Sequence, residues 1–291
     1  MEKQIRFPNL DIVLENVGKN IKIGNFSIAY YGILIGLGVI VGLLIAMMIA
    51  KKTGQKTDIY YDVAIVSILV GIPGARLYYV VFSWDYYKNH LNEIFNIRGG
   101  GLAIYGGIIF AVIGLIIYSK IKKNSLFLIL DTIVPGVAFA QAMGRWGNFF
   151  NREAFGEYTN NLFAMQLPEK AVTASSITDL MKQNIQVING TNFIQVHPTF
   201  LYESVWNILV CIFLIIMTKH KKYNGQIMIL YFLGYGLGRV WIEGLRTDQL
   251  IIGHTGIPVS QLLAGIIIAG SVAALIVLGI RKKQSEKKTA E

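Results

Sequence analysis

Four arginines lie within or at the ends of long apolar runs of this chain, at Arg76, Arg145, Arg239 and Arg246. A charged side chain in hydrocarbon is costly, so each one is a candidate functional group. Counted at about 1.5 Å per residue from the lysine-rich end of its run, Arg239 lies roughly 20 Å along its helix. By the same count Arg76 lies about 26 Å along and Arg145 about 28 Å, so all three fall in one outer third of a membrane.

Arginine suits phosphate, because its planar guanidinium bonds two oxygens at once. The phosphate of a phospholipid headgroup lies at the depth of these side chains. Tyr31 and Tyr105, on helices that run the other way, begin only about 5 Å below the same surface. The sequence therefore predicts a lipid-phosphate site at the outer end of a helix bundle.

A second interpretation is that the arginines reach the interface or form structural ion pairs with Glu153, Glu243 and Asp248. For Arg76 and Arg246, which are near the ends of their runs, both interpretations stay open. Arg145 and Arg239 favour a phosphate site, since Arg239 is too deep to reach the interface easily.

Residues 144–156, which we call the polar cassette, hold two arginines, two asparagines and a glutamate where an apolar run ends. Asn148 and Asn151 carry amides that both donate and accept, so they could hold ester or hydroxyl oxygens. The glycines of the cassette allow the backbone to approach a ligand closely. This chemistry fits a polar, anionic headgroup.

The elements that position these residues are membrane-spanning helices. Of 291 residues, 54% are hydrophobic and 15% charged, and the mean hydropathy of +0.51 is unusual for a soluble domain. About 20 apolar residues span a bilayer. The fold class we expect is an all-α integral membrane protein with one membrane domain, residues 28–280, and seven spans: 28–50, 59–82, 101–118, 126–147, 199–218, 226–244 and 258–280.

Orientation follows from the lysines and arginines of the short loops. Fourteen of them fall in one set of segments, which we expect to be cytoplasmic: Lys51, Lys52, Lys56, Lys120, Lys122, Lys123, Lys219, Lys221, Lys222, Arg281, Lys282, Lys283, Lys287 and Lys288. The other set is longer and has fewer basic residues. We therefore expect residues 1–27 outside as an interfacial segment, residues 148–197 as a small extracytoplasmic cap, and the basic tail 281–291 inside.

Other features exclude alternatives. The net charge of +10 lies in short bursts and not along one face, so membrane topology explains it better than nucleic acid. The single cysteine, Cys211, excludes an intramolecular disulfide and is interpreted as packing. No metal-binding motif is present. Residues 1–27 lack the features of a cleavable signal.

The polar cassette closely resembles the G-R-x-G-N-F-x-N-x-E-x-x-G signature of the prolipoprotein diacylglyceryl transferase family. The family's other landmarks resemble segments from the first span to the sixth, in the same order. These segments are Ala29-Tyr30-Tyr31-Gly32, Gly74-Ala75-Arg76-Leu77, Gly99 to Gly107, His197 to Glu203, and Tyr235-Gly236-Leu237-Gly238-Arg239 with Glu243 and Arg246. One departure is Tyr105, where members of the family often carry histidine.

The resemblance implies a bacterial cytoplasmic-membrane enzyme that moves an sn-1,2-diacylglyceryl group from phosphatidylglycerol to the lipobox cysteine of a prolipoprotein. Glycerol 1-phosphate would leave and a thioether would form, with the active site towards the outer leaflet and no cofactor or metal. As catalytic residues we expect Arg145, Arg239, Tyr105 and Glu243. As substrate-binding residues we expect Tyr31, Arg76, Gly106, Asn148, Asn151, Glu153, Gly156, His197, Tyr235 and Arg246.

Arg145 and Arg239 would hold the phosphate, while Glu153 and Glu243 would orient the arginines. The thiol must lose a proton, and Tyr105, His197 and direct capture of thiolate from solvent are all open as routes. Three of the expected site residues also have a simpler structural interpretation. His197 can cap its helix, and Tyr31 and Tyr235 can be interfacial aromatics. The alternative function is a transporter or channel for an anionic solute, because buried arginines also line anion pathways.

Overall fold

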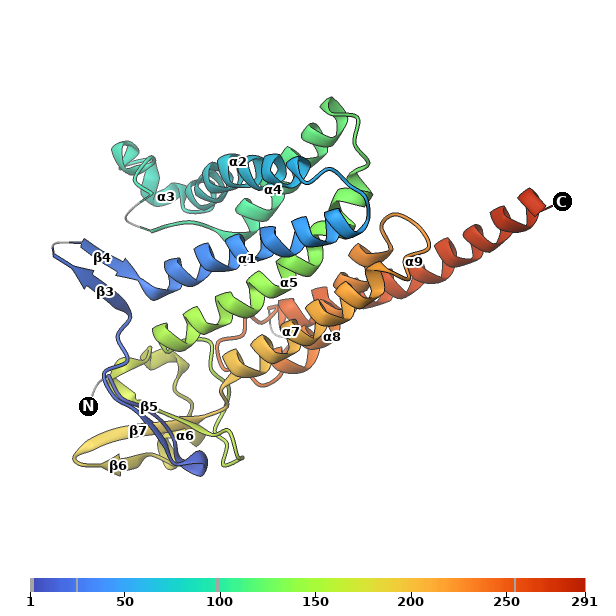
Figure 1. Ribbon diagram of the computed structural model, residues 1–291. Coiled ribbons are helices and arrows are strands. Elements are labelled where there is room, and N and C mark those ends of the chain that lie inside the picture. The colour runs from blue at the N-terminus through green and yellow to red at the C-terminus, as the bar shows by residue number, and fades with distance from the viewer. Residues whose placement is uncertain (1–2, 25, 98–99, 254, 291) are drawn as a thin grey trace. The chain divides into compact units, whose positions relative to one another are not determined.

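The computed structural model describes residues 3–24, 26–97, 100–253 and 255–290, with side chains to residue 286. Gly99 of the third-span motif and the side chains of Lys287 and Lys288 lie outside the described residues. Each of the seven predicted apolar runs overlaps one long helix (Figure 1). These helices are α1 Tyr30–Lys52, α2 Asp58–Phe82, α4 Ile104–Ile121, α5 Leu126–Asn151, α7 Thr199–Thr218, α8 Gln226–Glu243 and α9 Val259–Ala290.

Six of the described helices are long and apolar enough to cross a membrane, namely α1, α2, α4, α5, α7 and α9. The chain is therefore a multi-pass integral membrane protein. Helix α8 also has 18 residues, but it does not reach the same apolarity, because Gln226, Arg239 and Glu243 lower its mean hydropathy. The polar residues that make α8 interesting chemically are those that weaken its signal as a span.

The polar segments add elements that the all-α class leaves out. Two short helices, α3 Trp84–Tyr87 and α6 Asp179–Gln183, accompany seven strands in the described residues. The strands are β1 Ile5–Phe7, β2 Ile12–Leu14, β3 Asn20–Ile23, β4 Phe26–Ala29, β5 Met165–Pro168, β6 Gln186–Ile188 and β7 Thr191–Val196. The all-α prediction holds for the apolar helices and is wrong for the segments outside them.

The cap is a five-stranded antiparallel sheet with the order β2-β1-β5-β7-β6. Strand β1 pairs with β5 at Arg6 and Gln166, so the N-terminal segment is part of the cap. Its buried core includes Ile5, Leu167 and Ile194, and Phe149 of α5 and Phe200 of α7 pack against the same core. This shared core fixes the sheet to the ends of two membrane helices.

The chain divides into two compact units, residues 1–42 with 134–291, and residues 43–133. In the first, α1 and α5 meet with almost no space between their backbones: a Cβ on Gly42 would lie 2.9 Å from the Gly136 carbonyl oxygen. In the second, α2 packs against α4 equally closely, and a Cβ on Gly106 would lie 2.6 Å from the Gly74 carbonyl oxygen. Gly106, predicted to bind substrate, is thus required for helix packing.

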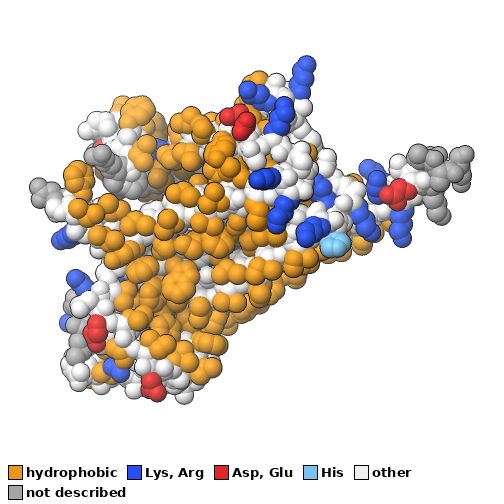
Figure 2. Space-filling view, viewed as in Figure 1, with side chains coloured by type: hydrophobic (Ala, Val, Ile, Leu, Met, Phe, Trp, Pro, Cys, Tyr) orange, Lys and Arg blue, Asp and Glu red, His pale blue; other side chains and the backbone are white. Residues whose placement is uncertain are grey.

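Hydrophobic side chains gather over the long helices (Figure 2). Lysine and arginine side chains gather near the loop that joins α4 and α5 and along the C-terminal part of α9. Apolar side chains that face outwards in such numbers, including Leu44, Leu69 and Ile266, are stable only where lipid covers them.

Candidate active site

Glu203, in the first turns of α7, is the centre of the buried charge cluster. Its carboxylate lies 2.8 Å from Arg145 Nε, 3.5 Å from Arg239 Nη1 and 3.9 Å from Arg246 Nη1. Arg145 comes from the last turns of α5 and Arg239 from the last turns of α8. Two segments far apart in the sequence, the end of α5 and the end of α8 with the residues that follow it, therefore bring three cations to one acid on α7.

Two further acids complete this arginine cluster. Arg239 Nη2 lies 2.6 Å from the Glu243 carboxylate one turn along α8, and Ser260 donates a hydrogen bond to the same carboxylate. Arg246 bonds Asp248 through Nε and Nη2, at 2.9 and 2.8 Å. Burial alone would raise the pKa of the Asp248 carboxyl, but the hydrogen bonds and charge of Arg246 outweigh it and hold that pKa below its ordinary value.

The cluster combines burial with a donor that makes no hydrogen bond to the described residues. The side chain of Glu203 is only 7% exposed, whereas Arg145 keeps 22% of its side chain accessible. Arg239 Nη1 is buried and has no hydrogen-bond partner among the described residues. A buried N–H without a partner costs free energy, so this atom favours an added anionic oxygen.

The polar cassette ends α5 and turns sharply after Asn151. Glu153 accepts hydrogen bonds from the amides of Asn148, at 2.9 Å, and Asn151, at 3.1 Å. The chain can turn here because Arg152 and Ala154 adopt left-handed backbone angles, both with φ of 57°. We predicted that Glu153 orients an arginine; in the structure it orients the two amides, and Arg145 pairs with Glu203 instead.

Gly156 joins the cassette to the end of β7 and to the segment after α8. Its N–H donates to the His197 carbonyl oxygen at 3.0 Å. Gly156 also forms an isolated antiparallel β-bridge with Arg246. A Cβ here would lie 2.7 Å from the Leu245 carbonyl oxygen and 2.8 Å from His197 Cβ. Glycine at this position allows the backbones around Arg246 and His197 to meet.

The His197 ring belongs to a small polar group at the cap. Its Nδ1 lies 3.3 Å from the Tyr202 hydroxyl and 3.4 Å from the Asn161 amide nitrogen. Burial lowers the pKa of His197 below its ordinary value, although the charge of Glu157 opposes this shift. His197 is therefore neutral at neutral pH and able to accept a proton.

The start of α1 packs on the cassette. The ring of Tyr30 stacks on Phe150, with centroids 4.5 Å apart. The ring of Tyr31 lies over Gly147, where a Cβ would overlap its Cδ2 atom. Gly147 thus admits the Tyr31 ring beside the polar cassette.

Arg76 has a different environment, in the second unit. Its guanidinium donates to the carbonyl oxygens of Glu93, Ile94, Gly100 and Gly101, at 2.6 to 3.0 Å. It also lies 5.2 Å from the centre of the Tyr87 ring. These contacts fix the loop between α2 and α4. Tyr105 follows that loop, and its side chain is 63% exposed.

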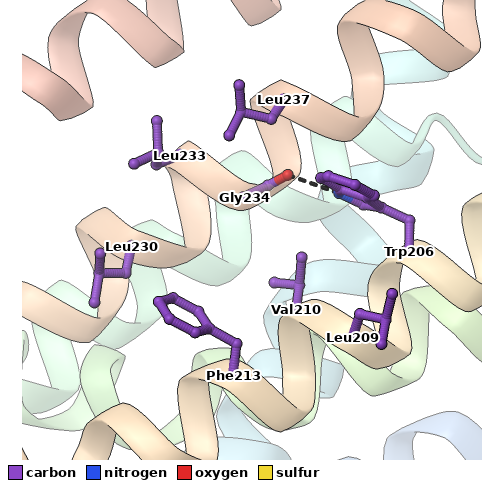
Figure 3. A pocket seen from close by; sticks show the side chains of 8 residues that line it. All are labelled: Trp206, Leu209, Val210, Phe213, Leu230, Leu233, Gly234 and Leu237. Carbon is purple, nitrogen blue, oxygen red and sulfur yellow. Dashed lines mark hydrogen bonds between the residues drawn. The ribbon is translucent and has the colours of Figure 1, made fainter.

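An apolar groove of about 310 Å³ runs between α7 and α8 (Figure 3). Trp206, one turn beyond Glu203, donates to the Gly234 carbonyl oxygen at 2.8 Å. Its ring occupies the space that Gly238 leaves open, next to Arg239. Tyr235, one turn before Arg239, is half-buried and stacks with Tyr231.

Sequence reasoning missed the central role of Glu203, which appeared only as the last residue of a motif. Its position could have been inferred, because it lies about 6 Å from the outer end of its helix, near the depth of the arginines. Among the described residues, no group of three or more His, Cys, Asp or Glu side chains could hold a metal ion. The arrangement is suited to binding and stabilising an anion.

Comparisons with known proteins agree with this chemistry. Residues 19–277 match the family model described as prolipoprotein diacylglyceryl transferase. A Clostridium botulinum phosphatidylglycerol–prolipoprotein diacylglyceryl transferase is 43% identical over 85% of this chain and 92% of its own length. Proteins of the same name from Clostridioides difficile and Clostridium kluyveri are 41% and 42% identical, over 89% and 90% of this chain and 94% and 96% of their own lengths.

Proposed function

We propose a role for each group in the arginine cluster of this chain, which belongs to the prolipoprotein diacylglyceryl transferase family. The reaction transfers a diacylglyceryl group from phosphatidylglycerol to a prolipoprotein, the first step of lipoprotein maturation. The comparisons do not support the alternative of an anion transporter or channel. The observation that carries the proposal is the convergence of Arg145, Arg239 and Arg246 on Glu203.

The arginines hold the phosphate of the donor lipid. Nη1 of Arg239, which has no hydrogen-bond partner among the described residues, and the accessible part of Arg145 supply donors to its oxygens. Glu203 and Glu243 fix both guanidinium planes before the lipid arrives, so little ordering remains to be done on binding. Without these acids, three half-buried cations would repel one another.

The chemical step forms a carbon–sulfur bond and breaks a carbon–oxygen bond. The lipobox thiolate attacks the terminal glyceryl carbon, and the phosphate oxygen leaves with the bonding electron pair as glycerol 1-phosphate. Negative charge therefore grows on the phosphate in the transition state. Fixed arginines stabilise that charge more than the charge of the ground state, which accelerates the reaction.

Asn148 and Asn151 bind the glycerol headgroup. Each amide uses one N–H on Glu153, and its oxygen and second N–H remain for hydroxyl groups. Phosphatidylethanolamine would instead bring an ammonium group towards the arginine cluster. We therefore expect strong preference for phosphatidylglycerol.

Two side chains remain as acceptors of the thiol proton. His197 is neutral at neutral pH, lies at the cap, and is joined through Gly156 to the backbone of Arg246. Tyr105 is exposed at the start of α4 and fits the position at which the family often has histidine. Solvent capture of a thiolate is the third route.

The topology that suits this chemistry has seven spans, α8 included, with the N-terminus outside and the C-terminus cytoplasmic. The arginine cluster then faces the outer leaflet of the bacterial cytoplasmic membrane, where the lipobox cysteine of an exported prolipoprotein emerges. Single cysteines placed at Lys122, Lys221 and, in the cap, Lys182 test this. Outside labelling at the first two positions in intact cells contradicts the orientation.

The direct test uses purified protein in vesicles with a lipobox peptide, and detects the thioether product by mass spectrometry. Phosphatidylglycerol should give product, while phosphatidylethanolamine and a peptide with serine in place of cysteine should not. Equal turnover of the two lipids contradicts the headgroup site. Uptake of an anionic solute without any thioether would contradict the transferase assignment.

A further inference from the structure

The hairpin of β3 and β4 has two chemically different faces. In its antiparallel register Ile21 pairs with Ile28 and Ile23 with Phe26, so these four apolar side chains share one face. Asn20, Lys22 and Ser27 lie on the other face. The hairpin is therefore amphipathic.

Neither face of the hairpin is covered by the described residues. The two strands form a sheet of their own, separate from the cap sheet, and every residue in both strands is exposed. Ile23 is 63% exposed and Phe26 is 73% exposed. Four large apolar side chains on one small exposed face favour a nonpolar partner.

The position in the chain identifies that partner. Ala29, the last residue of β4, is followed directly by Tyr30, the first residue of the membrane helix α1. Tyr30 N–H donates to the Lys19 carbonyl oxygen at 3.0 Å, which closes the base of the hairpin at the helix end. A hairpin fixed in this way lies at the surface of the bilayer that α1 enters.

We propose that this hairpin is an interfacial membrane anchor whose apolar face enters the lipid layer beside α1. Only side chains enter: the outer edges of two isolated strands carry unpaired backbone groups, which need water or lipid headgroups. Lys22, on the opposite face, then lies at the level of headgroup phosphates, and phosphatidylglycerol is an anionic lipid.

The anchor has a consequence for the active site, which rests on the proposed function. Tyr30 stacks on Phe150 and Tyr31 lies on Gly147, so the base of the hairpin is packed against the polar cassette. An inserted hairpin holds Asn148 at the depth of the headgroup that it is proposed to bind. The hairpin thus sets the depth of the headgroup site.

The test compares neighbouring positions on opposite faces of β3. Ile23→Cys and the matched control Lys22→Cys are labelled with an environment-sensitive fluorophore in the full chain, which is then placed in phosphatidylglycerol–phosphatidylcholine vesicles. The label at residue 23 should shift to the blue and be quenched by lipids brominated on their acyl chains. The label at residue 22 should be quenched by iodide in the water. The unmodified chain, labelled in parallel, corrects for Cys211.

Equal access of iodide to both labels overturns the proposal. So does a label at residue 23 that is protected from iodide but not quenched by brominated lipid, since a second copy or another protein then covers the face. This measurement needs no turnover, so it is independent of the proposed function. In active protein, Ile23→Ser with Phe26→Ser should lower turnover of bilayer phosphatidylglycerol about tenfold, with much less effect on a short-chain donor in detergent micelles.

Discussion

Buried and half-buried arginines serve two purposes in this protein, and their partners distinguish them. Arg76 donates to four backbone carbonyl oxygens, and Arg152 donates to those of Lys3, Val17 and Phe150. Neutral carbonyls hold each of these guanidinium groups and tie loops together. Arg145, Arg239 and Arg246 instead share carboxylates. Burial of an arginine therefore does not by itself identify a phosphate site; the nature of its partners does.

The largest effect should come from Arg239→Lys. Lysine keeps the charge but cannot hold Glu243 and also present a fixed donor to phosphate, because it lacks the planar fork. Turnover should fall by a factor on the order of a hundred or more, as on loss of a preorganised donor. The rate of thioether formation by purified protein in vesicles measures this fall in turnover. Arg145→Lys should lower turnover by a similar factor.

Arg152→Lys is the matched control within the same unit, since its partners are carbonyl oxygens. It should cost stability and leave most of the activity. A fully active, normally folded Arg239→Lys protein would abolish the distinction between the two groups of arginines.

Glu203→Gln should have the second-largest effect. The amide keeps the shape of the side chain but removes the charge that three arginines share. Breaking a buried ion pair in this way costs up to about 3–5 kcal/mol of folding free energy. Displaced arginines should also slow turnover, since an error of about 1 Å in position can cost as much as a hundredfold.

Thermal unfolding in detergent and turnover in vesicles measure the two effects of Glu203→Gln separately. Glu153→Gln is the comparison, because Glu153 contacts amides and should affect headgroup selectivity more than stability. Unchanged unfolding and unchanged turnover in Glu203→Gln would show that the acid does not organise the arginines.

A smaller effect on turnover is expected of Arg76→Lys. Lysine cannot reach the four carbonyl oxygens together, and a buried acceptor left without a donor costs about 1–3 kcal/mol. The unfolding temperature should fall while turnover, measured below that temperature, stays near normal. Normal unfolding with turnover reduced a hundredfold would instead make Arg76 a phosphate ligand, as its depth in the sequence suggested.

The apolar helices could be predicted because hydrocarbon demands long apolar runs, and the depth of Arg145 and Arg239 follows from counting residues along them. The cap sheet could not be predicted, because β1 and β5 are only three and four residues long and pair across about 160 residues of sequence. Glu203 was overlooked for a related reason. An acid in the first turns of a span is an ordinary residue until folding brings the arginines of α5 and α8 to it.

The smallest expected effect concerns His197, whose ring partners are the neutral groups of Asn161 and Tyr202. Burial lowers its folded-state pKa below the ordinary value of about 6.5, so protonation favours the unfolded chain. Its contribution to stability is present in full above pH 6.5 and is lost as the pH falls through the folded-state pKa. His197→Gln should be less stable than the unmodified chain at pH 7.5, and this deficit should shrink as the pH falls. Unfolding temperatures measured between pH 7.5 and 5 would show it.

Turnover at neutral pH tests which group accepts the thiol proton. If His197 accepts it, His197→Gln slows the reaction and Tyr105→Phe does not. The reverse result assigns the proton to Tyr105. If neither change slows the reaction, thiolate comes from solvent, and the half-buried His197 resembles Arg76 as a polar group that holds the fold together.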